Sequence, residues 1–168
     1  MTESEKKRSA ILKMAADLMR EHGLFEPEQN YKLSWNRRAV RTYGQCDTKR
    51  KLILISEKLA MLNPLETTRT VVLHEIAHAL TPKHGHDSVW RAKCLEIGGD
   101  GKRTYDSYSV VRVPARYEST CPTCGVHSHR HKKPTCNHSC GKCDPKHFNL
   151  THLLRWRDTK TGRLLPKK

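Results

Sequence analysis

Residues 68–80, TRTVVLHEIAHAL, are the part of the chain from which its fold can be worked out. Apolar side chains recur in this stretch with the spacing of a helix that buries one face against a core. Asn63 and Pro64 suit the N-cap and the first position of such a helix. Two histidines four residues apart, His74 and His78, then lie on one face of it. The stretch therefore predicts a buried helix that presents two imidazole rings side by side.

The residues from His74 to His78 form an H-E-x-x-H motif. In this motif the two histidines bind zinc and the glutamate acts as a general base. Glu75 is offset by one position, so it cannot easily bind the same ion, but it can reach a water molecule held there. Zinc lowers the pKa of bound water from about 15.7 to roughly 7, so Glu75 can take its proton as the water attacks a peptide carbonyl. The same motif also arises by chance on ordinary buried helices, so the other motifs must decide.

A zinc hydrolase needs a third protein ligand and an open fourth position. Three downstream residues could supply that ligand. His84 has the spacing of the metzincin pattern, but Thr81 stands where that pattern requires glycine. Glu96 lies on a predicted second helix, residues 87–98, and His86 lies just before it. Spacing alone leaves the choice among the three open.

The segment HEIAHALTPKHGHDSVW, residues 74–90, resembles the active-site segment of the SprT-like (Spartan-type) zinc metallopeptidases. In that family a histidine precedes the second helix and an aromatic residue follows four positions later. His86 and Trp90 match this pattern, and His84 does not. The resemblance continues into a C-terminal zinc ribbon and a basic C-terminus, and it covers most of the chain from about Tyr31 onward.

The resemblance implies a zinc metallopeptidase in which Glu75 is the catalytic base. The ligands that it implies for the catalytic zinc are His74, His78 and His86. Glu96 would then be a helix-surface residue or a hydrogen-bond acceptor for a ligand histidine, and His84 would be a loop residue near the cleft. The resemblance also implies a protease that acts on DNA-associated proteins, including covalent DNA–protein crosslinks in the Spartan branch.

A second motif consists of two C-x-x-C knuckles, CPTCG at 121–125 and CGKC at 140–143, separated by fifteen residues. Four thiolates in this spacing are typical of a zinc ribbon, which is a closed structural site. The predicted ligands of this structural zinc are Cys121, Cys124, Cys140 and Cys143. A redox C-x-x-C needs only one pair and a βαβ context, which is absent. Cys136, in the histidine-rich insert, could replace a knuckle cysteine, but the symmetric pairs argue against that.

The net charge of +15 is concentrated in the C-terminal part of the chain. Residues 1–99 contribute +5 and residues 100–168 contribute +10. Such a basic segment matches the footprint of a phosphate-binding surface, although part of the charge can compensate zinc-bound thiolates. We expect DNA, single- or double-stranded, as a partner. The predicted contacts are Arg130, Lys132 and Lys133 at the ribbon tip, and Arg155, Trp156 and Arg157 farther on.

The remaining sequence predicts an α+β fold: a small zincin-like metallopeptidase domain with helices and a short antiparallel sheet, followed by a zinc-ribbon module. The predicted divisions are residues 1–113, residues 114–160 and a basic tail at 161–168. In the first of these, residues 4–22 predict an amphipathic helix that Gly23 ends, and YKLSWNRR and RKLILIS predict strands. Residues 147–157 predict the last strand of the ribbon. In the connector, residues 100–120, one of three tyrosines could stabilise the oxyanion of the reaction: Tyr105, Tyr108 or Tyr117.

The polar opening MTESEKKRSA has no apolar region of a signal peptide, and no apolar run approaches the roughly 20 residues that span a bilayer. We expect a cytoplasmic protein, in the host cytoplasm if phage-encoded, without a membrane partner. The predicted function is zinc-dependent peptide hydrolysis of DNA-associated or DNA-crosslinked proteins, with two zinc ions per chain, one catalytic and one structural. The alternative is a non-catalytic zinc-ribbon adaptor that binds nucleic acid, with a structural or vestigial H-E-x-x-H site. The intact Glu75 favours the enzyme.

Overall fold

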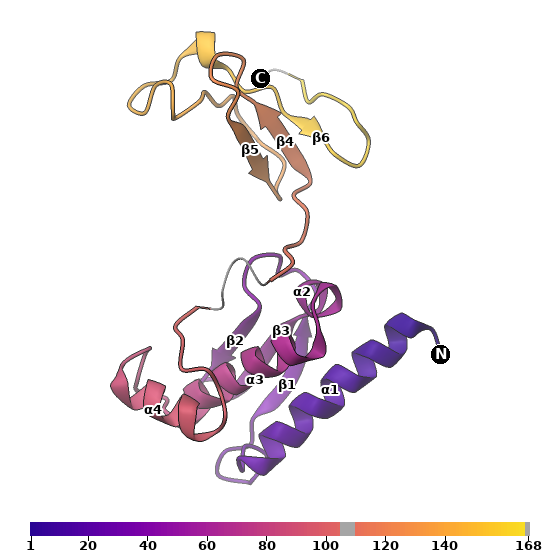
Figure 1. The fold of residues 1–168 in the computed structure, drawn as a ribbon, viewed down its shortest axis with the longest axis vertical. Helices are drawn as coiled ribbons and strands as arrows, with labels where there is room; N and C mark the ends of the chain where they lie inside the picture. The colour runs from indigo at the N-terminus through magenta and orange to yellow at the C-terminus, as the bar shows by residue number, and fades with distance from the viewer. Residues whose placement is uncertain (105–109, 167–168) are drawn as a thin grey trace. The chain divides into compact units, whose positions relative to one another are not determined.

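The computed structural model describes residues 1–104 and 110–166 of the chain. The chain divides into two compact units, Met1–Val113 and Pro114–Lys168, called here the first and second unit (Figure 1). The helices and small sheets together make this an α+β chain, as predicted. In chain order the first unit contains α1 (Glu3–Glu21), β1 (Lys32–Asn36), β2 (Gly44–Asp47), β3 (Leu52–Ser56), α2 (Glu57–Leu62), α3 (Leu65–Leu80) and α4 (Ser88–Glu96).

The sheet of the first unit has the strand order β1-β3-β2 and is mixed. Strands β2 and β3 form an antiparallel hairpin, but β1 runs parallel to β3. The prediction of an antiparallel sheet is therefore wrong for that pair. The seven residues between β1 and β2 cross the end of β3, where the Ser56 amide donates to the Tyr43 carbonyl and the Ser56 hydroxyl donates to the Ala39 carbonyl. This crossing carries β2 to the far side of β3 and leaves β2 at an edge of the sheet.

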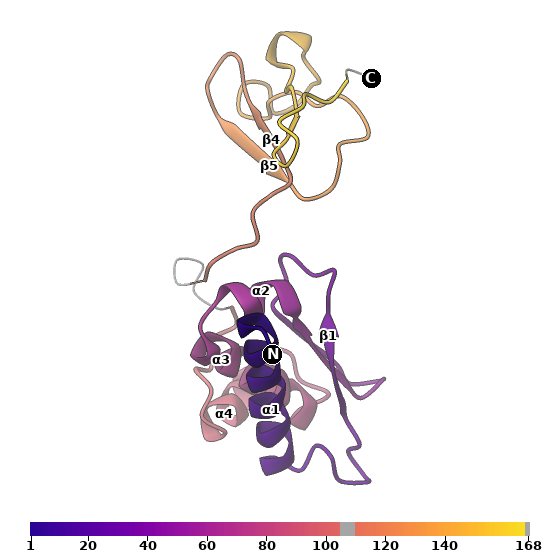
Figure 2. The ribbon, with the colours of Figure 1, turned by 90° about the vertical axis from the view of Figure 1, so that its right-hand side faces the viewer.

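The helices of the first unit gather on one face of this sheet (Figure 2). Helix α1 starts with a capping box, in which the Thr2 hydroxyl accepts from the Glu5 amide and the Glu5 carboxylate accepts from the Thr2 amide. The helix ends at Gly23, whose φ of +69° suits glycine. The predicted helix and its stop are confirmed. The apolar face that α1 buries in the core consists of Ile11, Ala15, Leu18 and Met19.

Helix α3 carries the H-E-x-x-H motif, but Asn63 does not cap it. Asn63 ends the short helix α2, and its side chain is only 1% exposed. The side-chain amide donates to the Leu59 and Val111 carbonyls, and the side-chain oxygen accepts from the Val111 amide at 2.7 Å. Pro64 occupies the cap position of α3 without a side-chain hydrogen bond. The predicted cap is wrong because α2 precedes α3 directly, and Asn63 is used to fasten a distant segment.

The second unit is built on a small antiparallel sheet of order β5-β4-β6, with β4 at Tyr117–Thr120, β5 at His127–Arg130 and β6 at Arg157–Asp158. Residues 147–157 are not one strand, because a 3-10 helix, η1, occupies Leu150–His152. The side-chain oxygen of Asn149 accepts from the Thr151 amide and so starts this turn. The core of the unit contains Tyr117, Cys121, Cys140, Leu154 and Trp156.

Residues 161–166, predicted as part of a basic tail, fold back onto the second unit. The Leu165 amide donates to the Trp156 carbonyl at 2.7 Å, and the Leu165 side chain packs against the core. Across the described parts of both units, no helix combines the length and apolar character needed to cross a bilayer.

Candidate active site and metal centres

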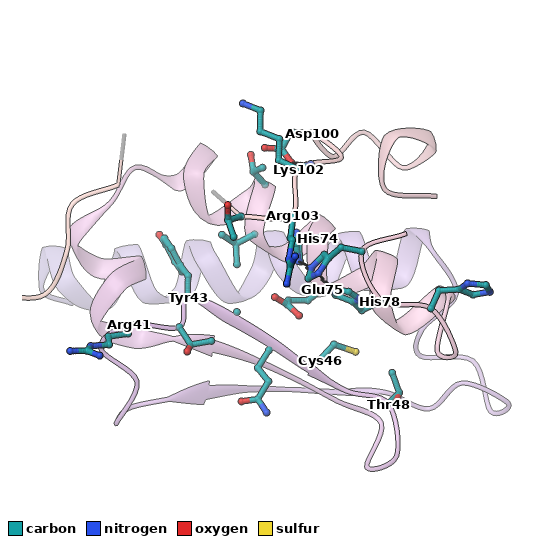
Figure 3. Close-up of a pocket in the computed structure, with 18 of the residues that line it drawn as sticks. Arg41, Tyr43, Cys46, Thr48, His74, Glu75, His78, Asp100, Lys102 and Arg103 are labelled. Carbon is teal, nitrogen blue, oxygen red and sulfur yellow. Dashed lines mark hydrogen bonds between the residues drawn. The ribbon is translucent and has the colours of Figure 1, made fainter. Parts of the chain in front are cut away.

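A cleft of the first unit, about 990 Å³ in volume, lies between α3, β2 and the segment after α4. Figure 3 shows His74, Glu75 and His78 on α3, with Glu75 directed towards the strand that carries Cys46. His78 lies one helical turn after His74, and Glu75 directly follows His74, so all three side chains reach this cleft. Sequence reasoning had placed the motif on such a helix, and the structure adds the strand that faces it.

Three imidazole nitrogens meet at one point of the cleft. The Nε2 atoms of His74, His78 and His86 lie 3.3 Å (His74 to His78), 3.1 Å (His78 to His86) and 3.0 Å (His74 to His86) apart. Ligand nitrogens at about 2.0–2.1 Å from a tetrahedral zinc ion are about 3.3 Å from one another. The donor set and its spacing therefore fit zinc, and His86 is the one of the three downstream candidates that joins the cluster.

Trp90 holds the three rings together. Its side chain is 1% exposed, and its ring centroid lies 4.7 Å from that of His74, 5.1 Å from that of His78 and 4.6 Å from that of His86. The N-cap of α4 fixes the position of Trp90, because the Asp87 carboxylate accepts from its amide at 3.0 Å.

The other two candidate ligands lie apart from the cluster. The Nδ1 atom of His84 lies 2.9 Å from the Asp87 carboxylate, so His84 lines the cleft without joining the cluster. Glu96 lies on the surface of α4 and pairs with Lys93 at 2.6 Å. Of the two roles expected for Glu96, the structure therefore supports the helix-surface role.

The His74 ring instead hydrogen-bonds to the backbone of Lys102, and Asp100 lies near it. This hydrogen bond orients the His74 imidazole, as is usual for metal-binding histidines. Sequence reasoning missed Lys102 because a backbone carbonyl carries no side-chain signal. In the sequence, only the carboxylate of Asp100, two residues earlier, indicates that a partner for the histidine could lie in this segment.

The electrostatics of the cleft keep the imidazoles neutral. Burial, followed by the neighbouring His78 and His86, lowers the pKa of His74 to about 4. Burial and His86 lower the pKa of His78 to about 4 as well. Burial and the nearby Arg103 lower the pKa of His86. Neutral imidazoles offer the lone pairs that a metal ion requires, so the site is prepared for a cation at neutral pH.

Glu75 is a buried carboxyl group beside this cluster, with a side chain only 6% exposed. Burial raises its pKa to about 8, while a hydrogen bond from the Cys46 backbone acts in the opposite direction. A general base is most effective when its pKa is close to the operating pH. The environment of Glu75 therefore suits a group that takes up and releases a proton near neutrality.

Only one of the three connector tyrosines lies among the described residues. Tyr105 and Tyr108 lie outside the described residues, and Tyr117 is buried in the core of the second unit. Four basic side chains that sequence reasoning missed also line the cleft: Arg41, Lys102, Arg103 and Arg112.

The four knuckle cysteines also come together, in the second unit. The Sγ atoms of Cys121 and Cys143 are 3.8 Å apart, and those of Cys124 and Cys140 are 3.7 Å apart. Sulfur ligands at about 2.3 Å from a tetrahedral zinc ion are about 3.8 Å from one another. The cluster therefore fits a structural zinc. Cys136 stands apart from it, exposed, with its sulfur 3.8 Å from the Nε2 atom of His138.

The predicted nucleic-acid contacts of the second unit divide into two groups. Lys132, Lys133, Arg155 and Arg157 are exposed. Trp156 is only 6% exposed, and the guanidinium of Arg130 lies 5.3 Å from the centre of its ring. The ring of Trp156 closes the core of the unit, and this burial disfavours the predicted contact between Trp156 and DNA.

Comparisons with known proteins agree with this geometry. A search among curated proteins gave no match. The sequence model of the SprT-like family matches residues 11–110, which include the second half of α1, the sheet, the three clustered histidines and α4. The match covers more than half of the chain and confirms the resemblance for these residues. The chain belongs to the SprT-like family.

Proposed function

We propose that the first unit hydrolyses peptide bonds, with a zinc ion held by His74, His78 and His86 and with Glu75 as the general base. The observation that supports this best is the placement of one buried carboxyl group beside three imidazole nitrogens at zinc-ligand spacing, in an open cleft. A purely structural site would have four protein ligands and no need for that carboxyl group.

When bound, zinc supplies a Lewis acid that polarises the scissile carbonyl and makes water acidic. Glu75 accepts a proton from the attacking water at its carboxylate and later donates it to the leaving nitrogen. The Lys102 backbone and Trp90 hold the imidazoles in place while this happens. The edge strand β2 lines the cleft, so an extended substrate can pair with it as an added β-strand.

Glu75→Gln tests the proposal. The variant should retain its zinc and lose hydrolysis of an unfolded protein such as labelled casein by about 10²-fold or more, the usual contribution of a general base. Glu96→Gln is the matched control, because it makes the same change in an exposed carboxylate of α4 and should keep full activity. A Glu75→Gln protein as active as wild type would refute the assignment of the base.

We further propose that the second unit binds DNA and brings DNA-associated proteins to the cleft. Residues 114–168 carry twelve lysines and arginines against three acidic residues. A four-thiolate zinc site has a net charge of about −2, so most of this positive charge is left to act on phosphates.

The salt dependence of DNA binding tests this second proposal. Replacing Lys132 and Lys133 together by alanine should reduce the slope of log K against log salt by up to about 1.8. The matched control replaces two exposed lysines of the first unit, Lys13 and Lys58, and should leave the slope unchanged. Undetectable binding at low salt would refute the proposal. Binding to DNA without any peptidase activity in wild type would instead favour the non-catalytic adaptor.

A further inference from the structure

Gly44, on strand β2, occupies a position where no other residue fits without moving its neighbours. A Cβ atom built there would lie 2.5 Å from Oε1 of Glu75, 2.8 Å from Cγ of Glu75 and 2.7 Å from Cγ1 of Val71. The backbone of Gly44 is ordinary strand, without the positive φ that favours glycine elsewhere in the chain. The glycine is therefore explained by close approach and not by a turn.

The approach is close because β2 runs along one face of α3. Thr68, Val71 and Glu75 follow one another on that face at steps of three and four residues. The hydroxyl of Tyr43, the residue just before β2, lies 2.9 Å from the hydroxyl of Thr68, a buried contact that ties the start of the strand to the first turns of the helix. The next residue, Gly44, begins the strand and lies against Val71 and Glu75.

Strand β2 also supplies a hydrogen-bond donor to the same carboxyl group. The Cys46 amide donates to Glu75. Gly44 and Cys46 are two residues apart on the strand, so their side-chain positions share one face of the sheet. The strand thus provides a surface without a side chain at Gly44 and an amide at Cys46, and the Glu75 carboxyl group lies against both.

We infer that Gly44 is a positioning residue for Glu75: the missing Cβ lets the carboxyl group lie against β2, beside the three histidines. This inference rests on the proposed function for its catalytic meaning. Of the atoms that an added Cβ would meet, the Glu75 carboxylate is the most easily displaced, because it ends a flexible side chain. Gly44→Ala therefore moves the base, and the three histidines, whose rings contact Trp90, keep their arrangement.

The first test is the kinetics of Gly44→Ala. We expect kcat to fall about 10²-fold, the usual contribution of a general base, with KM and zinc content unchanged. In a Glu75→Gln background the same substitution should cost no further residual activity, because Gly44 acts through Glu75. Ile11→Val, a conservative change in the buried core on α1, is the control for lost stability and should leave kcat unchanged.

The second test does not depend on activity. Hydrogen exchange of the Cys46 amide, measured by NMR, should be slow in wild type and Ile11→Val and faster in Gly44→Ala and in Glu75→Ala, which removes the acceptor. If Gly44→Ala does not fold, adding Glu75→Ala removes two of the three close contacts, and the double variant should be the more stable of the two.

Each outcome separates the two proposals. If Gly44→Ala has the kcat and the Cys46 protection of wild type, the role of Gly44 is refuted and the proposed peptidase function still stands. A double variant that is no more stable than Gly44→Ala would have the same meaning. A wild-type protein that hydrolyses no peptide, but whose Cys46 amide loses protection in Gly44→Ala, would refute the proposed function and support the positioning of Glu75 by Gly44.

Discussion

Replacing Glu75 by glutamine should stabilise the metal-free first unit, and the gain should grow with pH. The folded protein holds the Glu75 carboxyl group with a pKa of about 8, against an ordinary value of 4.5. A group whose pKa is raised by folding contributes stability that is fully present below pH 4.5 and is lost as the pH rises through about 8. Glutamine has nearly the same shape and does not ionise, so it escapes this loss.

The size of the effect follows from the two pKa values. Each unit of difference corresponds to about 1.4 kcal/mol, so the pH-dependent gain should be about 1 kcal/mol at pH 5, about 3 kcal/mol at pH 7 and at most about 5 kcal/mol above pH 9. A bound cation favours the ionised carboxylate, so the gain should shrink when zinc is present.

Urea unfolding with a chelator, followed by circular dichroism at 222 nm, measures this free energy. All α-helices of the described residues lie in the first unit, so the signal reports that unit. The quantity to compare is the difference between Glu75→Gln and wild type at pH 5, 7 and 9, which removes the titration of the histidines. Glu96→Gln should show no such trend, since Glu96 is exposed. A Glu75→Gln gain that is the same at pH 5 and pH 9 would refute the argument from burial.

Further predictions follow from the metal centres and the core. His86→Ala should lower the zinc content from two ions to one per chain by elemental analysis, and two ions in the variant would contradict the three-histidine site. Cys124→Ser should also leave one zinc, with the helical signal at 222 nm unchanged; a loss of that signal would contradict the separate folding of the two units. Asn63→Ala should lower the free energy of unfolding by about 1–3 kcal/mol, because it leaves the part-buried Val111 amide without its acceptor, and an unchanged free energy of unfolding would contradict that role. Trp90→Ala should cost about 3–5 kcal/mol and weaken zinc binding in the first unit, whereas unchanged zinc affinity would mean that the ring does not position the histidines.

Features set by local chemistry were predictable from the sequence. The capping box of α1 and its stop at Gly23, the Asp87 cap of α4 and the helical H-E-x-x-H motif each depend on residues within a few positions of one another. The four knuckle cysteines and the pair His74 and His78 were predictable from ligand spacing, which indicates metal sites. The third histidine, His86, was predictable only from the resemblance to the SprT-like family.

Features set by distant contacts were missed. The parallel pairing of β1 depends on Ser56, whose hydroxyl holds the crossing segment at Ala39. Asn63 has the chemistry of a helix cap, but its partner Val111 lies 48 residues away, and only the fold shows which partner it takes. The surface that receives Glu75 is a glycine, Gly44, which looks like a turn residue in the sequence and carries no functional group of its own.

The two halves of the proposed active site differ in how far along the chain their contacts reach. His74 and His86 are 12 residues apart, so the loop that zinc closes between them costs little chain entropy. The contact between Gly44 and Glu75 spans 31 residues and exists only while the sheet is packed on α3. Partial unfolding that detaches β2 should therefore leave a pair of helices that still holds metal but no longer holds its base. Metal retention should outlast catalysis as the protein is heated, and zinc content alone is a poor measure of how much active protein a preparation contains.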